Sequence, residues 1–201
     1  NINQILPIDK PEYWEASLTG YLFYASTVYS DLYNLLSKNG HYKKALSIKF
    51  KDDQVRDRIA QHICVAYLEG WEKLEKEDSQ INLLLNSNDE KILSATINFF
   101  SMQRKSVSDK VKSCIKPLWE QLFTRIEEKK ENEEYQKLLS DTSKFLSLID
   151  TIDDDIFGWL KLSAQYINSN YNSPLFIESL LKHAKKSPKE VAELFLVILN
   201  S

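Results

Sequence analysis

The sequence predicts an all-α fold, and three observations support that prediction. Apolar residues recur every three or four positions along most of the 201 residues, which is the spacing of one face of an α-helix. No segment shows the clean alternation of apolar and polar residues that is typical of a half-buried β-strand. Only four glycines occur, although a sheet-rich fold of this size needs many tight turns.

Helix starts and stops can be assigned along the first hundred residues. Pro11 suits the first turn of a helix, and Asn39-Gly40 terminates a second one before a short helix at 41–48. Asp52 or Asp53 is expected to cap a long helix, a brief helix follows near 78–89, and Asn88 or Asp89 is expected to cap the next helix. The apolar stripes of the first and the long helix are Trp14, Leu18, Tyr21, Leu22, Ala25; and Val55, Ile59, His62, Ile63, Ala66, Gly70.

The second half of the chain continues the same pattern. Residues 106–150 are helical almost throughout, and Pro117 is expected to kink or split that stretch because proline removes an interior hydrogen bond. The charged segment 127–134 is expected to be an exposed helix end or loop. A helix starts at 153–155, a polar turn is expected at 168–174, and Pro174 and Pro188 start the last two helices.

About ten or eleven helices joined by short loops predict antiparallel helix pairs. Trp119 and Trp159 lie forty residues apart, a spacing within the length of HEAT units. We therefore expect an irregular HEAT-like α-solenoid of antiparallel helix pairs, and a single compact multi-helix bundle is the alternative. Residues 1–201 are expected to form one helical-repeat domain with an internal joint near 127–134. The chain lacks an initiator methionine, so we expect a fragment of a larger protein.

Composition argues against several classes of function. The net charge of −3 counts against nucleic-acid binding, because neutralising phosphates requires a basic excess. No run of 18 apolar residues predicts a membrane span. The two cysteines, Cys64 and Cys114, lie fifty residues apart outside any CxxC motif, which favours a reducing cytoplasm.

Residues with reactive side chains are scattered. His62 falls on the apolar stripe of its helix and Cys64 is about 200° away around that helix, so we interpret His62 as a packed core histidine. Cys114 fits a small buried residue, although its basic helix could lower the thiol pKa slightly. The carboxylates Asp150, Asp153, Asp154 and Asp155 lack the spacing of a calcium loop and suit helix capping. We therefore predict no catalytic residues, no metal and no cofactor.

Two sets of surface residues are candidate interaction sites. Aromatic residues crowd the first forty positions, more than one helix face can bury, and tyrosine and tryptophan are favoured at protein interfaces. The candidates are Tyr13, Trp14, Tyr21, Tyr24, Tyr29 and Tyr33. The most basic stretch, 104–116, would be the nucleic-acid site of an alternative function, and it contains Arg104, Lys105, Lys110, Lys112 and Lys116.

Two stretches resemble a pattern in large bacterial proteins. Residues 52–100 and 150–199 are similar to the helical-repeat C-terminal regions of bacterial signal-transduction NTPases of the kind used in phage defence, and together they cover about half of the chain. The resemblance assigns a structural role to seven residues: Arg58, Gln61, His62, Tyr67, Gly70, Gly158 and Trp159. It implies a sensor or scaffold tail that binds a protein ligand, with any NTPase activity outside this chain, which has no P-loop.

The function expected from the sequence is a non-catalytic protein-interaction or sensor module. Its expected partners are a protein ligand or other domains of the parent chain, and no membrane. A nucleic-acid-binding helical-repeat domain is the first alternative. An all-helical enzyme that uses His62 with an acidic partner is the second.

Overall fold

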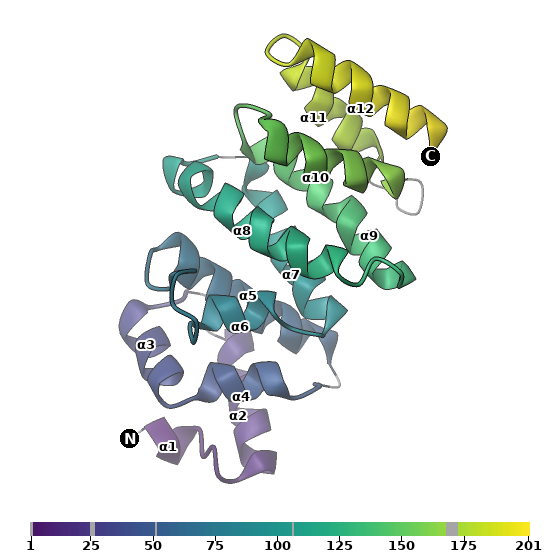
Figure 1. Ribbon diagram of the computed structural model, residues 1–201. Helices are drawn as coiled ribbons and strands as arrows, with labels where there is room; N and C mark the ends of the chain where they lie inside the picture. The colour runs from purple at the N-terminus through teal and green to yellow at the C-terminus, as the bar shows by residue number, and fades with distance from the viewer. Residues whose placement is uncertain (1, 25–26, 51, 106, 168–172) are drawn as a thin grey trace. The chain divides into compact units, whose positions relative to one another are not determined.

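The all-α prediction is confirmed. The computed structural model describes residues 2–24, 27–50, 52–105, 107–167 and 173–201, and every regular element in those ranges is helical (Figure 1). In chain order the elements are α1 Ile2–Ile5, α2 Pro11–Tyr24, α3 Ser30–Lys38, α4 His41–Ser47, α5 Asp53–Leu68, α6 Gln80–Leu85, α7 Glu90–Ser101, η1 Met102–Lys105, α8 Asp109–Glu127, α9 Glu133–Thr142, η2 Ser143–Leu148, α10 Asp154–Gln165, α11 Ser173–His183 and α12 Pro188–Asn200.

The chain forms two compact units, Asn1–Thr96 and Ile97–Ser201, which we call unit 1 and unit 2. Their boundary lies within α7. The charged segment 127–134 lies inside unit 2, where it connects the end of α8 to the start of α9. The single-domain arrangement, the solenoid and the compact bundle stay predictions.

Unit 1 is organised around α5. Helices α2, α3, α4 and α6 all pack against α5. The helix is buried on most sides, because Ile59, Ile63, Cys64 and Ala66 have almost no exposed surface. The apolar stripe predicted for α2 faces this core through Trp14, Leu18 and Leu22, while Ala25 lies outside the described residues.

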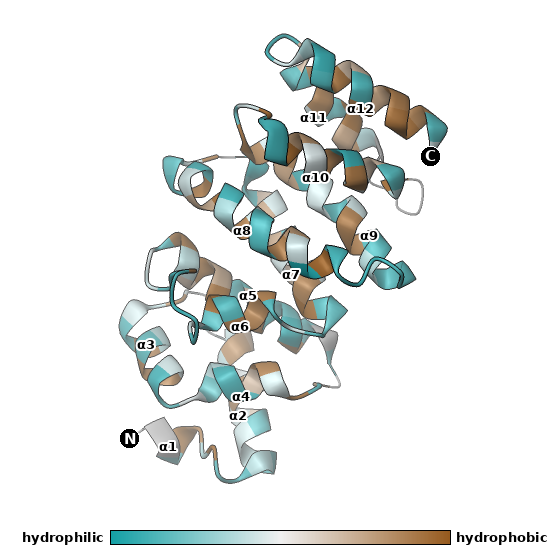
Figure 2. Ribbon diagram, in the orientation of Figure 1, coloured by the Kyte–Doolittle hydropathy of each residue, from teal (hydrophilic) through white to brown (hydrophobic). Residues whose placement is uncertain are grey.

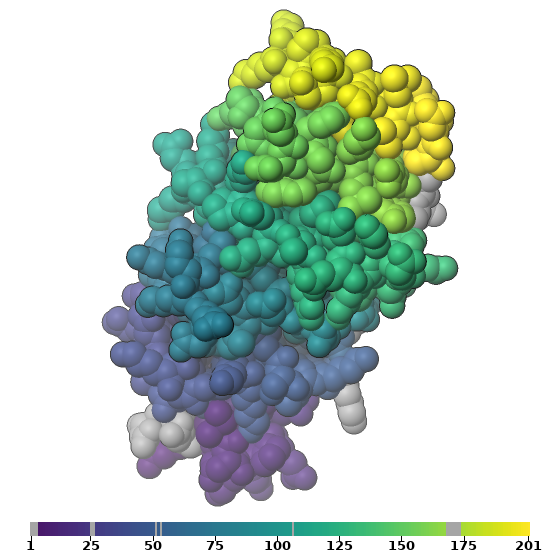
Figure 3. Space-filling model, viewed as in Figure 1, coloured from purple at the N-terminus to yellow at the C-terminus, as the bar shows by residue number. Residues whose placement is uncertain are grey.

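Unit 2 is a series of neighbouring helices. Helix α8 packs against α9, α9 against α10, and α10 against α12. The core contains an aromatic cluster in which the ring of Trp119 lies 5.6 Å from Phe145 and 5.5 Å from Trp159. Figure 2 shows hydrophobic and hydrophilic residues on the same helices, α8 and α10, as expected of amphipathic helices. In the space-filling view of Figure 3, side chains fill the spaces between these helices.

Several predicted helix starts are confirmed. Asp52 accepts a hydrogen bond from the Gln54 backbone, Asp89 from Lys91, and Asp153 from Ile156, as capping side chains do. Pro188 is the first residue of α12. The polar turn expected at 168–174 lies mostly outside the described residues.

The expectation that Pro117 splits its helix is wrong, and the expected kink stays a prediction. Helix α8 runs through Pro117 without a break. Buried residues on both sides of the proline, among them Ile115, Leu118 and Trp119, hold the two halves of α8 in one core, and this tertiary packing offsets the lost hydrogen bond. None of the described helices is long and apolar enough to cross a membrane.

Candidate interaction groove

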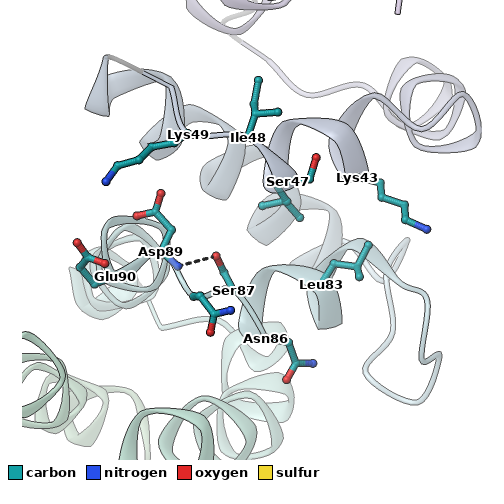
Figure 4. Close-up of a pocket in the computed structure, with 11 residues that line it drawn as sticks. Lys43, Ser47, Ile48, Lys49, Leu83, Asn86, Ser87, Asp89 and Glu90 are labelled. Carbon is teal, nitrogen blue, oxygen red and sulfur yellow. Dashed lines mark hydrogen bonds between the residues drawn. The ribbon is translucent and has the colours of Figure 1, made fainter. Parts of the chain in front are cut away.

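A groove of about 560 Å³ lies on unit 1 between two short segments of chain (Figure 4). One wall is α4 with the residues just after it, and the other is the end of α6 with the connection to α7. We call this the α4–α7 groove. Its lining residues are Lys43, Leu46, Ser47, Ile48, Lys49, Leu83, Asn86, Ser87, Asn88, Asp89 and Glu90.

The two walls are joined by one buried arginine of α5, Arg56. Arg56 donates a hydrogen bond from Nη2 to the Phe50 carbonyl oxygen at 2.6 Å, next to the α4 wall. Its Nε lies 3.3 Å from Asp89 Oδ2 in the other wall. Arg56 is 4% exposed and the Asp89 side chain is 19% exposed, so the ion pair is partly shielded from water. Arg56 therefore links the two walls through one hydrogen bond and one partly buried ion pair.

The connection between α6 and α7 has its own local bonds. The Asp89 backbone N–H donates to Ser87 Oγ at 3.1 Å, which is the dashed line in Figure 4. Asp89 Oδ1 accepts from the Lys91 backbone N–H and so caps α7. Asn86 Nδ2 donates to the Asn82 carbonyl at the end of α6. Capping explains why this polar sequence forms a tight connection instead of a continuous helix.

The groove has different chemistry at its two ends. Figure 4 places Lys49 near Asp89 and Glu90 at one end, and Lys43 near Leu83 at the other. The lining combines the apolar side chains of Leu46, Ile48 and Leu83 with polar groups of serine and asparagine. Such a mixture suits a polypeptide segment, which offers backbone donors and acceptors together with side chains of both kinds.

The predicted aromatic candidates divide into exposed and buried residues. Tyr13, Tyr24 and Tyr29 are 68%, 90% and 64% exposed. Tyr13 and Tyr24 are eleven residues apart on α2, about three helical turns, and so lie on one face of it. These three residues can reach a partner, and their use in an interface stays a prediction.

Trp14 and Tyr33 are corrections to that set, because both side chains are completely buried. Trp14 Nε1 donates to His41 Nδ1 at 2.9 Å, and the Tyr33 hydroxyl donates to Glu72 Oε1 at 2.9 Å. Their polar atoms therefore hold the unit 1 core together. Tyr21 is half-buried, with its ring 5.5 Å from His62.

His62 is a packed core residue, as its helical position predicts. The side chain is 3% exposed and Nδ1 lies 3.1 Å from the Tyr42 hydroxyl oxygen. Burial, with a smaller effect from the charge of Arg58, lowers the pKa of His62 to about 4. A neutral, enclosed imidazole is poorly placed to exchange protons with a substrate.

The thiol and the carboxylate cluster also have structural surroundings. Burial raises the pKa of Cys114 to about 11, so the expected slight lowering is wrong: the Sγ is close to the Val111 carbonyl rather than to a base. No group of three histidine, cysteine or acidic side chains in the described ranges could hold a metal ion. Asp150, Asp153 and Asp155 instead pair with lysines of α8.

The basic stretch is not a single surface. Lys112 Nζ lies 2.7 Å from Asp150, and Lys116 Nζ lies 2.7 Å from Asp153 and 3.3 Å from Asp155. The hydrogen bond from Lys112 lowers the pKa of Asp150. At Asp153 burial is the largest single effect and raises the pKa, but hydrogen bonds from Lys116 and the Ile156 backbone together bring the pKa below its usual range. Arg104 and Lys105 belong to η1 instead and line a separate cavity. Pairing with carboxylates weakens the nucleic-acid alternative.

The groove itself escaped the sequence analysis. The only signal for it in the sequence is the polar run 86–90 between two helices, which is typical of a helix cap and does not indicate a binding site. Arg56 carries no signal, because a charged residue on an amphipathic helix is normally exposed. No model of a known protein family matches this chain, and no curated protein or solved structure is significantly similar to it.

Proposed function

We propose that the chain is a non-catalytic protein-interaction module whose α4–α7 groove binds an extended segment of a partner protein. The observation that supports this proposal is a groove of mixed polar and apolar lining with walls joined by buried Arg56. A groove that is already fixed before binding loses less conformational entropy when a peptide enters it.

The lining provides a partner for each part of a peptide. Hydroxyl groups of Ser47 and Ser87 and the amide of Asn88 can face backbone groups of an extended chain. Ile48 and Leu83 offer contact area for an apolar side chain. Lys49 and Glu90 provide charges of both signs, which favours a segment with charges of its own and fixes its direction.

The exposed tyrosines provide a second contact surface in this proposal. Tyr13 and Tyr24 lie on one face of α2, and Tyr29 precedes α3. Large aromatic side chains give much contact area for few rotatable bonds, which is why they are enriched in binding sites. We propose that they extend the interaction beyond the groove.

The wider setting is also part of the proposal. The resemblance of residues 52–100 and 150–199 to tails of bacterial defence-type NTPases supports a ligand-sensing tail of a larger, cytoplasmic protein. The two cysteines are not joined in a disulfide, which suits a reducing compartment. Purified protein that hydrolysed nucleotides would contradict the non-catalytic assignment.

A displayed library of short random peptides tests the groove directly. We expect the wild-type protein to enrich a related family of peptides, and Ile48→Arg to weaken their binding at least tenfold, because the new side chain fills the groove. Leu196→Arg is the matched control: Leu196 is 60% exposed on α12, and its replacement should leave binding unchanged.

Two outcomes would overturn the groove assignment. One is the absence of any enriched peptide family. The other is binding that Ile48→Arg leaves intact, and if the triple variant Tyr13→Ala, Tyr24→Ala, Tyr29→Ala then abolishes it, the binding surface is the tyrosine face instead. Circular dichroism of each variant checks that its helices are retained.

A further inference from the structure

Unit 2 contains a cavity of about 300 Å³ with an unusual concentration of positive charge. Four cationic side chains line it: Arg104 and Lys105 from η1, Lys144 from η2 and Lys182 from α11. They come from three elements that are far apart in the sequence. Because the cations converge on one cavity rather than following one helix face, the arrangement differs from an ordinary solvated surface.

Carboxylates offset part of this charge. Lys182 Nζ lies 2.8 Å from Glu178, and Lys144 Nζ lies 2.9 Å from Asp141. The hydrogen bond from Lys182 lowers the pKa of Glu178, with smaller effects from the charges of Lys182 and Arg104. The four cations still outnumber the two carboxylates by two. The excess is about the charge of one phosphomonoester, roughly −1.5 to −2 at neutral pH.

The donors around the cavity also point to an anion. Ser147 Oγ and Ser179 Oγ donate their protons to backbone carbonyls, so the cationic side chains are the main donors toward the cavity. Arg104 is an exposed side chain, and a guanidinium group binds two oxygens of a phosphate at once. Lysines add point charges to the remaining oxygens.

A less polar cavity of about 450 Å³ shares five of these lining residues and adds Met102. Met102 is 71% exposed in η1, and Leu175 of α11 lines both cavities. Together they offer an apolar surface beside the cationic cluster. The combined space is in the range of small-molecule sites, about 300–1,000 Å³.

We propose that this cavity binds the phosphate group of a phosphorylated small molecule, with the rest of the ligand on Met102 and Leu175. The phosphate contacts Arg104, Lys105 and Lys182. The cavity belongs to unit 2 and the α4–α7 groove to unit 1, and this proposal is independent of the peptide-binding proposal. It would give the module a second, small-molecule input.

Isothermal titration calorimetry with matched ligand pairs tests the proposal. The probes are AMP with adenosine and ribose 5-phosphate with ribose. We expect both phosphomonoesters to bind, neither neutral parent to bind, and AMP to bind more tightly because its base contacts Met102. The proposal is overturned if neither phosphomonoester binds, or if AMP and adenosine bind with equal affinity.

Two double variants distinguish binding in the cavity from a general effect of the net charge of the protein. Arg104→Ala with Lys105→Ala should weaken AMP binding at least tenfold. Lys112→Ala with Lys116→Ala removes the same charge from the same unit outside the cavity, and should change binding less than twofold. Equal weakening by both double variants overturns the proposal, because it shows an unspecific charge effect.

Two further measurements complete the test. If the first double variant is misfolded by circular dichroism, Lys182→Ala replaces it, since that side chain is largely exposed and the same loss of binding is expected. A DNA oligonucleotide is the other probe. Binding of DNA that is tighter than that of AMP, and is weakened by both double variants, contradicts the cavity and favours a nucleic-acid surface.

Discussion

In unit 1 buried polar side chains bond to other segments of the chain, whereas in unit 2 most buried hydroxyls bond within one turn of their own helix, with Thr142–Ser163 and His183–Leu146 as the cross-element exceptions. Trp14 bonds to His41 and Tyr33 to Glu72, which join residues 27 and 39 positions apart. In unit 2, by contrast, Ser143 and Ser179 donate to carbonyls three or four residues earlier. Cross-helix ion pairs of unit 2, such as Lys112 with Asp150, lie on the surface.

This difference indicates that polar contacts specify how the helices are arranged in unit 1 more than they do in unit 2. A local bond satisfies a buried hydroxyl but does not fix one helix relative to another. A cross-helix bond does both, and removing one partner leaves the other buried without its bond. Unit 1 should therefore be more sensitive to polar substitutions than unit 2. Hydrogen exchange measured on peptides from α5 and α8 reports on the two units separately.

The largest expected effect comes from Arg56→Ala, which breaks the contact between the groove walls. The Asp89 side chain is 19% exposed, so the loss of its counter-charge should cost about 3 kcal/mol, the lower end of the range for buried ion pairs. We expect exchange protection of α5 to fall strongly while that of α8 is little changed. The matched control is Arg58→Ala on the same helix, because Arg58 is exposed. Equal effects of the two variants would show that the Arg56–Asp89 contact does not stabilise unit 1.

Acid should destabilise unit 1 through His62. The pKa of His62 is about 4 in the folded protein and about 6.5 in the unfolded chain, so the unfolded chain takes up the proton first as pH falls below 6.5. The loss grows through the window from pH 6.5 to 4, and reaches about 3 kcal/mol at its lower end. His62→Gln keeps a polar group near Tyr42 and cannot titrate. It should flatten the pH dependence of α5 protection, and an unchanged slope would contradict this assignment.

These contacts mark the limit of what the sequence predicts. Apolar spacing and caps such as Asp52 and Asp153 are local, and they correctly predict helices and the burial of His62. Spacing along α2 also shows that Trp14 belongs to an apolar stripe, yet the crowding of aromatics placed it among surface candidates. The Trp14–His41 bond depends on how helices pack against one another, and so does the Arg56–Asp89 pair. A local sequence pattern does not determine that packing. The α4–α7 groove is formed by the same tertiary packing, so the sequence does not predict it.

A matched pair of tryptophan substitutions isolates one cross-helix bond. Trp14 Nε1 donates to His41, while Trp119 Nε1 has no hydrogen-bond partner among the described residues. Both rings are completely buried, so Trp→Phe removes a similar apolar volume in each unit. We expect Trp14→Phe to cost about 1–2 kcal/mol more than Trp119→Phe, because only Trp14→Phe leaves a buried partner unsatisfied. Equal losses of exchange protection in the two units would contradict a role for the Trp14–His41 bond.

The smallest effect is expected at Asp153, where unit 2 combines a cap with a surface ion pair. Asp153 Oδ1 accepts from the Ile156 backbone and Oδ2 from Lys116. Asp153→Asn keeps the cap and removes the charge, and we expect no measurable change, since exposed ion pairs contribute little. Asp153→Ala removes the cap as well and should cost about 1 kcal/mol, measured as faster exchange at the start of α10. If Asp153→Asn were as damaging as Asp153→Ala, the surface pair would matter more than the cap, and unit 2 would resemble unit 1 in its dependence on charge.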